Sequence, residues 1–156
     1  MITLTSADFK LLAALQANAD LSQQDLAEIA GMSKTSVWRR IRDLEEAGVI
    51  TDKVALLNAR ALGLNIHVMV SVSMVAHSDD VRRAFETHVE TLAPVTEAYA
   101  VSGDWDYLLH VLTDDIDSYN HFLNREILNH RSVRSASSSF ALKRVKYTTR
   151  LPIAGQ

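Results

Sequence analysis

A run of basic residues between positions 34 and 42 contains the side chains of this sequence that are best suited to bind a polyanion. The run holds Lys34, Arg39, Arg40 and Arg42 and no acidic residue. Arginine can donate two parallel hydrogen bonds to guanine, while lysine and hydroxyl groups bind either base edges or phosphates. Because the whole chain has a formal net charge of −3, this local patch favours specific binding of double-stranded DNA over indiscriminate binding.

The residues around this run have the spacing of a helix-turn-helix. Such a motif needs a small residue in its second helix, a turn residue that tolerates a positive φ, and an apolar residue in its third helix. Ala27, Gly31 and Val37 occupy these positions. Ser33 can cap the third helix, and Gly48 can end it. The N-terminal part of such a third helix enters the major groove of DNA.

The third helix divides its side chains between the protein and DNA. With Val37 and Ile41 facing inward, the polar and basic side chains face outward. We predict groove contacts for Ser36, Arg39 and Arg40 and phosphate contacts for Lys34, Thr35 and Arg42. Trp38 either packs against the first helix or contacts DNA. The basic run alone would also fit a solvated helix face, but its combination with the turn spacing and a wing favours DNA binding.

Two further helices and a hairpin are expected to position this third helix. The first helix is predicted over residues 5–18, and the second begins at Ser22, whose spacing to Asp25 resembles a capping box. Residues 49–57 have apolar and β-branched side chains on both sides of a polar pair, which predicts a short hairpin, the wing. The N-terminal part of the chain is therefore predicted to be a winged helix-turn-helix.

The second half of the sequence changes to the periodicity of an α+β domain. Apolar residues alternate with His67, Ser71 and Ser73, as in a strand with one buried face. The predicted elements are a strand at residues 66–75, a helix capped by Ser78, strands at 95–102 and 105–112, a helix with Ile116, Tyr119, Leu123 and Ile127 facing inward, and a strand at 133–147. The order β-α-β-β-α-β defines a ferredoxin-like α+β unit.

These elements predict two domains joined by a linker. A polar stretch with Gly63 separates the two patterns. With 156 residues in total, each domain has a thin core, so we expect stability to depend partly on self-association. The predicted boundaries are 1–57 for the winged helix-turn-helix domain, 58–65 for the linker and 66–156 for the ferredoxin-like domain.

The composition argues against several classes of site. There is no cysteine, so the chain has neither disulfides nor a cysteine-based zinc site. The six histidines form no pair at a spacing of three or four residues, and no serine lies in a G-x-S-x-G setting. We therefore predict no metal, no cofactor and no enzymatic activity. Neither a signal peptide nor an apolar stretch of about 20 residues is found, which predicts a cytoplasmic protein without a membrane partner.

Several motifs occur in an order that is characteristic of one protein family. The N-terminal motif is Ala-Gly-Met-Ser at residues 30–33, followed by Val-x-x-Arg-Ile-x-x-Leu-Glu from residue 37. The C-terminal motifs are Val-Ser-Gly-Asp-Trp-Asp-Tyr-Leu-Leu at 101–109 and Val-Lys-Tyr-Thr-Thr at 145–149. Over essentially the whole chain, the sequence resembles the leucine-responsive and asparagine-operon (Lrp/AsnC, or feast/famine) transcription regulators.

The resemblance implies a C-terminal domain of the RAM type that dimerises through its sheet and assembles further, up to octamers or larger discs that wrap DNA. It also implies an amino-acid effector in clefts between these domains. The residues that would bind the effector are Gly103, Asp104, Trp105, Asp106, Ser137 and Ser138. Family members often carry two threonines in the last strand, where this chain has Ala136 and Ser138. The local alternatives are a tight turn with solvated acids and an ordinary strand.

The sequence therefore predicts a sequence-specific DNA-binding transcription regulator. Its expected partners are double-stranded DNA, a small effector such as an amino acid, and further copies of the chain, as a dimer or up to an octamer. An architectural protein that organises DNA without an effector is the alternative. An enzyme is a third class, because ferredoxin-like dimers also support small-molecule chemistry, but the absence of cysteine, of a metal cluster and of a phosphate loop argues against it.

Overall fold

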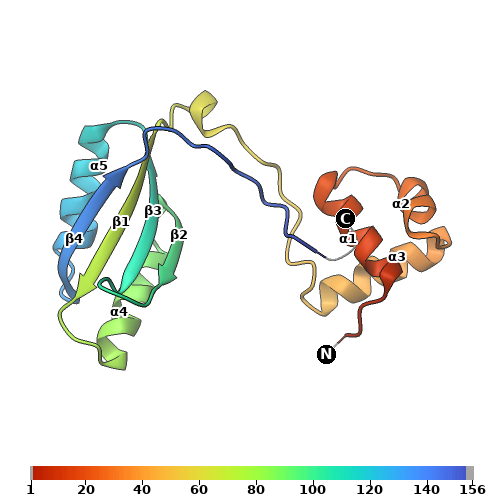
Figure 1. Ribbon diagram of the computed structural model, residues 1–156, viewed down its shortest axis with the longest axis horizontal. Coiled ribbons are helices and arrows are strands. Elements are labelled where there is room, and N and C mark those ends of the chain that lie inside the picture. The colour runs from red at the N-terminus through yellow and green to blue at the C-terminus, as the bar shows by residue number, and fades with distance from the viewer. Residues whose placement is uncertain (1, 154–156) are drawn as a thin grey trace. The chain divides into compact units, whose positions relative to one another are not determined.

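The computed structural model describes residues 2–153, which separate into two compact units (Figure 1). One unit comprises the chain up to Leu56 together with the tail from Lys146, and the other comprises Leu57–Val145. The sequence places the tail in the second domain, whereas in the structure it contacts the first. The Leu151 N–H donates to Gln16 Oε1 at 2.9 Å, and the Leu151 carbonyl accepts from Gln16 Nε2 at 3.0 Å. No helix within residues 2–153 is long and apolar enough to cross a membrane.

The first unit is built from three helices, α1 (Ser6–Ala17), α2 (Gln23–Ala30) and α3 (Lys34–Glu46). Each begins after a hydroxyl residue whose side chain accepts a backbone N–H of the first turn, namely Thr5, Ser22 and Ser33. The predicted capping box of α2 is confirmed, because the Asp25 carboxylate also accepts the Ser22 N–H. Gly31, with a φ of 67°, ends α2 in the left-handed conformation that the predicted turn requires.

Apolar side chains from all three helices form the core of the first unit. Leu11 of α1, Leu26 of α2, and Val37 and Leu44 of α3 are buried. Since Val37 and Leu44 lie on one side of α3, this packing fixes which side of the helix faces the protein and leaves the opposite side to solvent.

The predicted wing is not formed. Residues 49–58 contain no strand, so the prediction of a hairpin over residues 49–57 is wrong. The segment has no glycine for a tight turn, and an isolated two-stranded hairpin is at best marginally stable. Lys53 instead lies beside the end of α3, where its Nζ is 2.7 Å from Glu45 Oε1.

The second unit is a four-stranded antiparallel sheet with helices on one face (Figure 1). The strand order is β2-β3-β1-β4, which confirms the predicted ferredoxin-like α+β fold. The last strand is shorter than predicted. The elements in chain order are the 3-10 helix η1 (Ala59–Leu62), β1 (Ile66–Met74), α4 (Asp79–Glu90), β2 (Val95–Ala100), β3 (Tyr107–Thr113), α5 (Ile116–Phe122), the π-helix η2 (Leu123–Leu128) and β4 (Val133–Phe140).

The two faces of the sheet carry different side chains. In β1, Val68, Val70 and Val72 are buried beneath the helices. His67 and Met69 alternate with them and point to the other face, which no helix of this unit covers. The sheet therefore has a closed face, which forms the core, and an open face.

The prediction that Ile116 faces the core is wrong, because its side chain is exposed. Ile116 is the first residue of α5, directly after the capping residue Asp115. Tyr119, Phe122 and Ile127 cover the sheet in its place. The π-helix that follows α5 has wider turns, so a constant spacing of 3.6 residues does not describe this segment.

Four histidines form two stacked pairs in the second unit. His67 Nδ1 lies 3.1 Å from His110 Nε2, on the open face of the sheet. His88 on α4 stacks on His130, with ring centroids 4.9 Å apart. Burial is the main cause that lowers the pKa of both His67 and His130, and nearby histidine and arginine charges act in the same direction.

These lowered pKa values predict that the second unit loses stability in mild acid. Below the ordinary histidine pKa of about 6.5, the unfolded chain binds more protons than the folded chain, so the free energy of unfolding falls as the pH falls. Urea unfolding at pH 7.5 and 5.5 measures this difference. In the double variant His67→Gln/His130→Gln the difference should shrink, and the exposed His121→Gln should behave as wild type. Equal pH dependence in wild type and double variant would refute this assignment.

Candidate nucleic-acid interface and ligand loop

The outward face of α3 gathers most of the residues that the sequence assigns to DNA. Lys34, Thr35 and Arg39 are exposed. Ser36 is half-buried, and its hydroxyl lies 2.8 Å from that of Ser33 at the start of the helix. Lys34 and Arg39 form no ion pair with another residue in the described part of the chain. Their charges are thus available to an external anion.

Trp38 and Arg42 form a second exposed group on α3. Trp38 is 51% exposed, and the Arg42 guanidinium carbon lies 5.9 Å from the centre of its ring. The structure therefore does not place Trp38 in the core against α1. Arg42 Nε also lies 2.8 Å from Glu46 Oε1, but both side chains are exposed and such a pair contributes little to stability. Arg42 can leave Glu46 for a phosphate at small cost.

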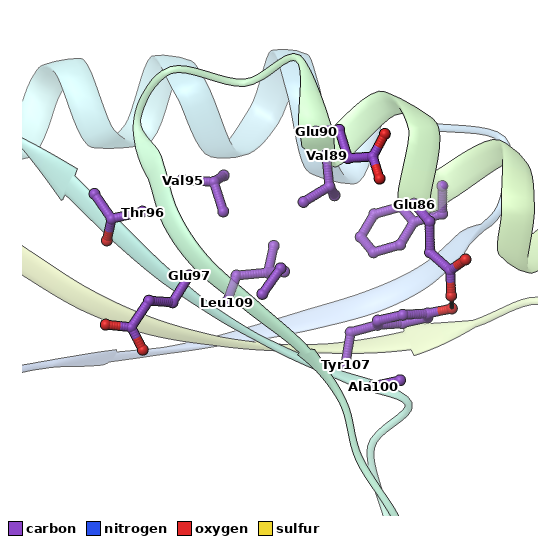
Figure 2. A pocket seen from close by; sticks show the side chains of 11 residues that line it. Glu86, Val89, Glu90, Val95, Thr96, Glu97, Ala100, Tyr107 and Leu109 are labelled. Atoms are coloured by element: carbon purple, nitrogen blue, oxygen red, sulfur yellow. Dashed lines mark hydrogen bonds between the residues drawn. The ribbon is translucent and has the colours of Figure 1, made fainter. Parts of the chain in front are cut away.

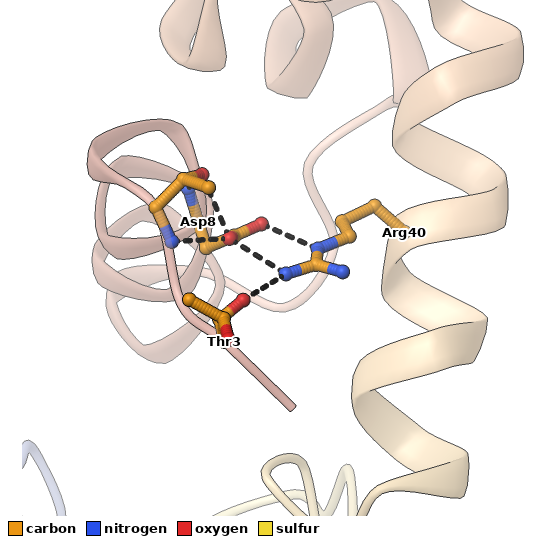
Figure 3. A network of polar contacts seen from close by, with 4 residues as sticks. Thr3, Asp8 and Arg40 are labelled. Carbon is orange, nitrogen blue, oxygen red and sulfur yellow. Dashed lines mark hydrogen bonds and ion pairs between the residues drawn. The ribbon is translucent and has the colours of Figure 1, made fainter. Parts of the chain in front are cut away.

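Arg40 points the other way, into the three-helix unit (Figure 3). Its Nε lies 2.7 Å from Asp8 Oδ1, and its Nη2 lies 2.8 Å from both Asp8 Oδ2 and the Thr3 carbonyl oxygen. Only 21% of the Arg40 side chain and 1% of Asp8 are exposed. We therefore correct the prediction that Arg40 contacts the DNA groove. Its guanidinium instead bonds to Asp8 and links α3 to α1.

The same arrangement keeps the Asp8 carboxylate charged. Asp8 Oδ2 also accepts the Thr5 N–H at 2.7 Å and the Thr5 hydroxyl at 2.8 Å. The side-chain hydrogen bonds from Arg40 are the main cause that holds the pKa of Asp8 well below its usual range, against burial, which raises it. The sequence analysis assigned no structural role to Asp8, although Thr5 and Asp8 have the same three-residue spacing as the capping box at Ser22.

The loop between β2 and β3 carries four of the residues that the resemblance assigns to an effector. Gly103 has a φ of 121°, which residues with a side chain rarely adopt. The Asp106 carboxylate is already bonded, because Oδ2 accepts the Met74 N–H at 2.7 Å and Oδ1 lies 3.1 Å from His77 Nδ1. Asp104 is exposed and bonds to no other described residue. Asp104 is therefore the loop carboxylate that remains available for an ammonium group.

Among the predicted effector residues, Ser137 and Ser138 are not brought together with this loop in one chain. Trp105 is half-buried within the loop. Ser137 and Ser138 pair with the middle of β1, whereas the loop bonds to the end of β1. The two serines also point to opposite faces of the sheet, since the Ser138 hydroxyl bonds to the Tyr119 hydroxyl beneath the helices and Ser137 is exposed.

Two parts of the chain match known domains. Residues 67–151 match the Lrp/AsnC ligand binding domain, which is more than half of the chain. Residues 4–51 match a winged helix-turn-helix DNA-binding domain. The two matches correspond to the sheet unit with part of the tail and to the three-helix unit.

Named relatives match the chain over nearly its full length. It is 36% identical over 146 residues to the DNA-binding transcriptional activator DecR of Escherichia coli K12, covering 94% of this chain and 96% of DecR. It is 40% identical to an AsnC family transcriptional regulator from Agrobacterium tumefaciens, with a TM-score of 0.89 over 96% of this chain and 97% of that one. A Neisseria meningitidis transcriptional regulator crystallised with L-methionine is 35% identical, with a TM-score of 0.90 over 96% and 97%.

Because Asp8 also pairs with Arg40, removing its carboxylate should destabilise the protein more than removing a carboxylate that only completes a capping box. Asp8→Ala removes the acidic half of the capping box of α1 and leaves the Arg40 guanidinium without its anion, so the free energy of unfolding should fall by about 3 kcal/mol. Asp25→Ala is the matched control, because Asp25 holds the same capping position in α2 without an arginine, and it should cost about 1 kcal/mol.

Urea unfolding followed by circular dichroism measures both losses. Because the pKa of Asp8 is lowered in the folded state, the advantage of wild type over Asp8→Ala is fully present above the ordinary aspartate pKa of about 3.9 and declines as the pH falls below it. Equal losses in the two variants at pH 7 would show that the ion pair contributes nothing beyond the cap.

Proposed function

Because this chain belongs to the Lrp/AsnC family of DNA-binding transcription regulators, we propose that it binds operator DNA with the outward face of α3 and that an amino acid modulates this binding. The observation that carries the proposal is the division of α3 into two sides. Its inner side is fixed by Val37, Leu44 and the Arg40 ion pair, and its outer side presents the unpaired cations Lys34 and Arg39.

The contacts assigned to DNA follow from this division. Arg39 is an exposed side chain near the middle of α3 and is assigned to base edges in the major groove, with Ser36 beside it. Lys34, Thr35 and Arg42 are assigned to phosphates, and the exposed Trp38 ring to the DNA backbone next to Arg42. Arg40 is left out of the set because its Nε and Nη2 groups bond to Asp8 and to the Thr3 carbonyl within the protein.

Self-association is assigned to the open face of the sheet. This face has no helix of its own unit over it, and it carries apolar side chains such as Met69 and Tyr99, which are 40% and 55% exposed. A second copy that packs its own open face there would bury these side chains, as expected of a two-fold symmetric dimer. Dimers present two reading helices and thus suit operators with two half-sites.

The effector is assigned to the loop that contains Gly103 and Asp104. The Asp104 carboxylate can accept charge-assisted hydrogen bonds from an α-ammonium group. The related Neisseria meningitidis regulator that was crystallised with L-methionine makes an amino acid the first ligand class to test. Since Ser137 and Ser138 lie apart from this loop in one chain, they take part only if another copy supplies them.

Arg39→Ala tests the DNA interface. If Arg39 contacts a base, the affinity for DNA selected from a random pool should fall by roughly 1–3 kcal/mol, discrimination between bases should relax, and the salt dependence should become shallower. Fluorescence anisotropy over a salt series measures all three. Arg60→Ala, an exposed arginine of the other unit, is the matched control. Wild-type affinity and specificity in Arg39→Ala would remove this residue from the interface.

Asp104→Asn tests the effector loop. In wild type, at least one of the common L-amino acids, L-methionine among them, should shift the DNA affinity or the oligomeric state, with a coupling typically between 5- and 150-fold. Asp104→Asn should abolish the shift and keep DNA binding, and Asp117→Asn, an exposed acid on α5, should keep both. If no amino acid shifts either property in wild type, the result favours the alternative of an architectural DNA-binding protein without an effector.

A further inference from the structure

A cleft of about 350 Å³ lies between α4 and the edge strand β2, and none of the loop residues 101–106 lines it. Phe85 and Val89 of α4, Val95 at the start of β2 and Leu109 of β3 supply apolar walls. Figure 2 shows Val89, Val95 and Leu109 around the centre of the cleft, with the Glu86–Tyr107 pair at one end. A volume of this size lies at the lower end of the range for small-molecule sites.

The cleft exists because the edge strand carries small side chains toward α4. Ala98 pairs with Leu109 and Ala100 with Tyr107, so both alanines point to the closed face of the sheet, yet both remain exposed. Their methyl groups are too short to reach α4, whereas Leu109 and Tyr107 on the next strand are buried under it. The apolar floor is therefore left open along β2, where a ligand can bury it.

The charged groups at the cleft are acidic. Glu86 and Glu90 lie one turn apart on α4, and no lysine, arginine or histidine lines the cleft. The Glu86 carboxylate is fixed at the wall, because its Oε1 accepts the hydroxyl of the buried Tyr107 at 2.7 Å. Burial and the hydrogen bond and charge of Glu86 raise the pKa of Tyr107, so the phenol stays protonated and donates to Glu86.

The remaining carboxylates differ in how they are engaged. Glu90 has no bonding partner among the described residues. Glu97 accepts the Tyr99 hydroxyl at 2.8 Å, and in Figure 2 its carboxylate points away from Val89 and Leu109. The carboxylates that a bound molecule meets are thus Glu86 and Glu90.

We propose that this cleft binds a small organic cation, namely a primary amine with an apolar chain or ring and no carboxylate. The apolar part would lie against Val89, Val95 and Leu109, and the ammonium group between Glu86 and Glu90. A carboxylate on the same molecule would meet these like charges. Arg82, a cation near Glu86, does not line the cleft and is paired with Asp79 at 2.7 Å, so the cleft discriminates against amino acids. It is therefore a second ligand site, distinct in chemistry from the loop at Asp104.

The probe for this site is 2-phenylethylamine, which carries a six-membered ring and an ammonium group. Its matched comparators are 2-phenylethanol, which lacks the charge, and L-phenylalanine, which adds the carboxylate. Ligand-observed NMR and calorimetric titration of the full chain at pH 7 should show saturable binding of the amine, with at least ten-fold weaker binding of the other two. Saturation should occur within about 10 mM, in the range expected for a ligand of about nine non-hydrogen atoms.

Two variants in the cleft and one control outside it test whether the amine binds there. Ala98→Leu fills the floor from an exposed position and should weaken amine binding at least ten-fold. Glu90→Gln removes one charge and should weaken it at least three-fold. Glu28→Gln, an exposed acid on α2, should leave it unchanged. Circular dichroism of each variant checks that it is folded, and DNA binding without ligand should match wild type in all three.

Several outcomes would overturn the proposal. These are equal affinity for 2-phenylethylamine and 2-phenylethanol, tighter binding of L-phenylalanine than of the amine, wild-type affinity in both Ala98→Leu and Glu90→Gln, or no saturable amine binding by wild type. A failure here leaves the proposed DNA and amino-acid functions untouched, because those depend on α3 and on the loop at Asp104.

Discussion

The buried ion pair between Asp8 and Arg40 joins the first helix of the DNA-binding unit to the third, and the orientation of the reading helix depends on it. Apolar packing through Leu11, Val37 and Leu44 brings the helices together, but such contacts tolerate small rotations. A two-pronged guanidinium–carboxylate contact has a fixed geometry and therefore restricts rotation of α3 about its axis. Successive residues of a helix are separated by about 100°, so fixing Arg40 inward directs Arg39 outward.

Much of the fold follows from local signals that are visible in the sequence. The hydroxyl caps at Ser22 and Ser33 and the turn at Gly31 are set by hydrogen bonds within a few residues, and the structure has them where the sequence places them. The ion pair of Arg40 could not be predicted from local signals, because its partner Asp8 lies 32 residues away. The hydrophobic periodicity of a helix does not show whether a cation faces the protein or the solvent. The prediction of the wing was wrong because it relied on local strand propensity alone. Residues 49–57 have that propensity, but they have no glycine for a tight turn and no third strand to pair with.

The ligand loop shows a similar limit. The family motif groups Gly103, Asp104 and Asp106, but the predicted strand at 105–112 wrongly includes Asp106, which lies in the loop before β3 and bonds to the end of β1. Nor do the family motifs show that Ser137 and Ser138, although adjacent in sequence, face opposite sides of a strand. The period of two along a strand explains this separation, and it also divides the sheet into a closed face that forms the core and an open face.

The contact between Gln16 and Leu151 has a consequence for how the protein is made. The tail that completes the three-helix unit is encoded about a hundred residues after the helices themselves. During synthesis the helices leave the ribosome first and can pack, but α1 obtains its final partner only after the whole sheet has been translated. A ribosome that stops early, or a frameshift within the sheet, would release helices that lack this last contact.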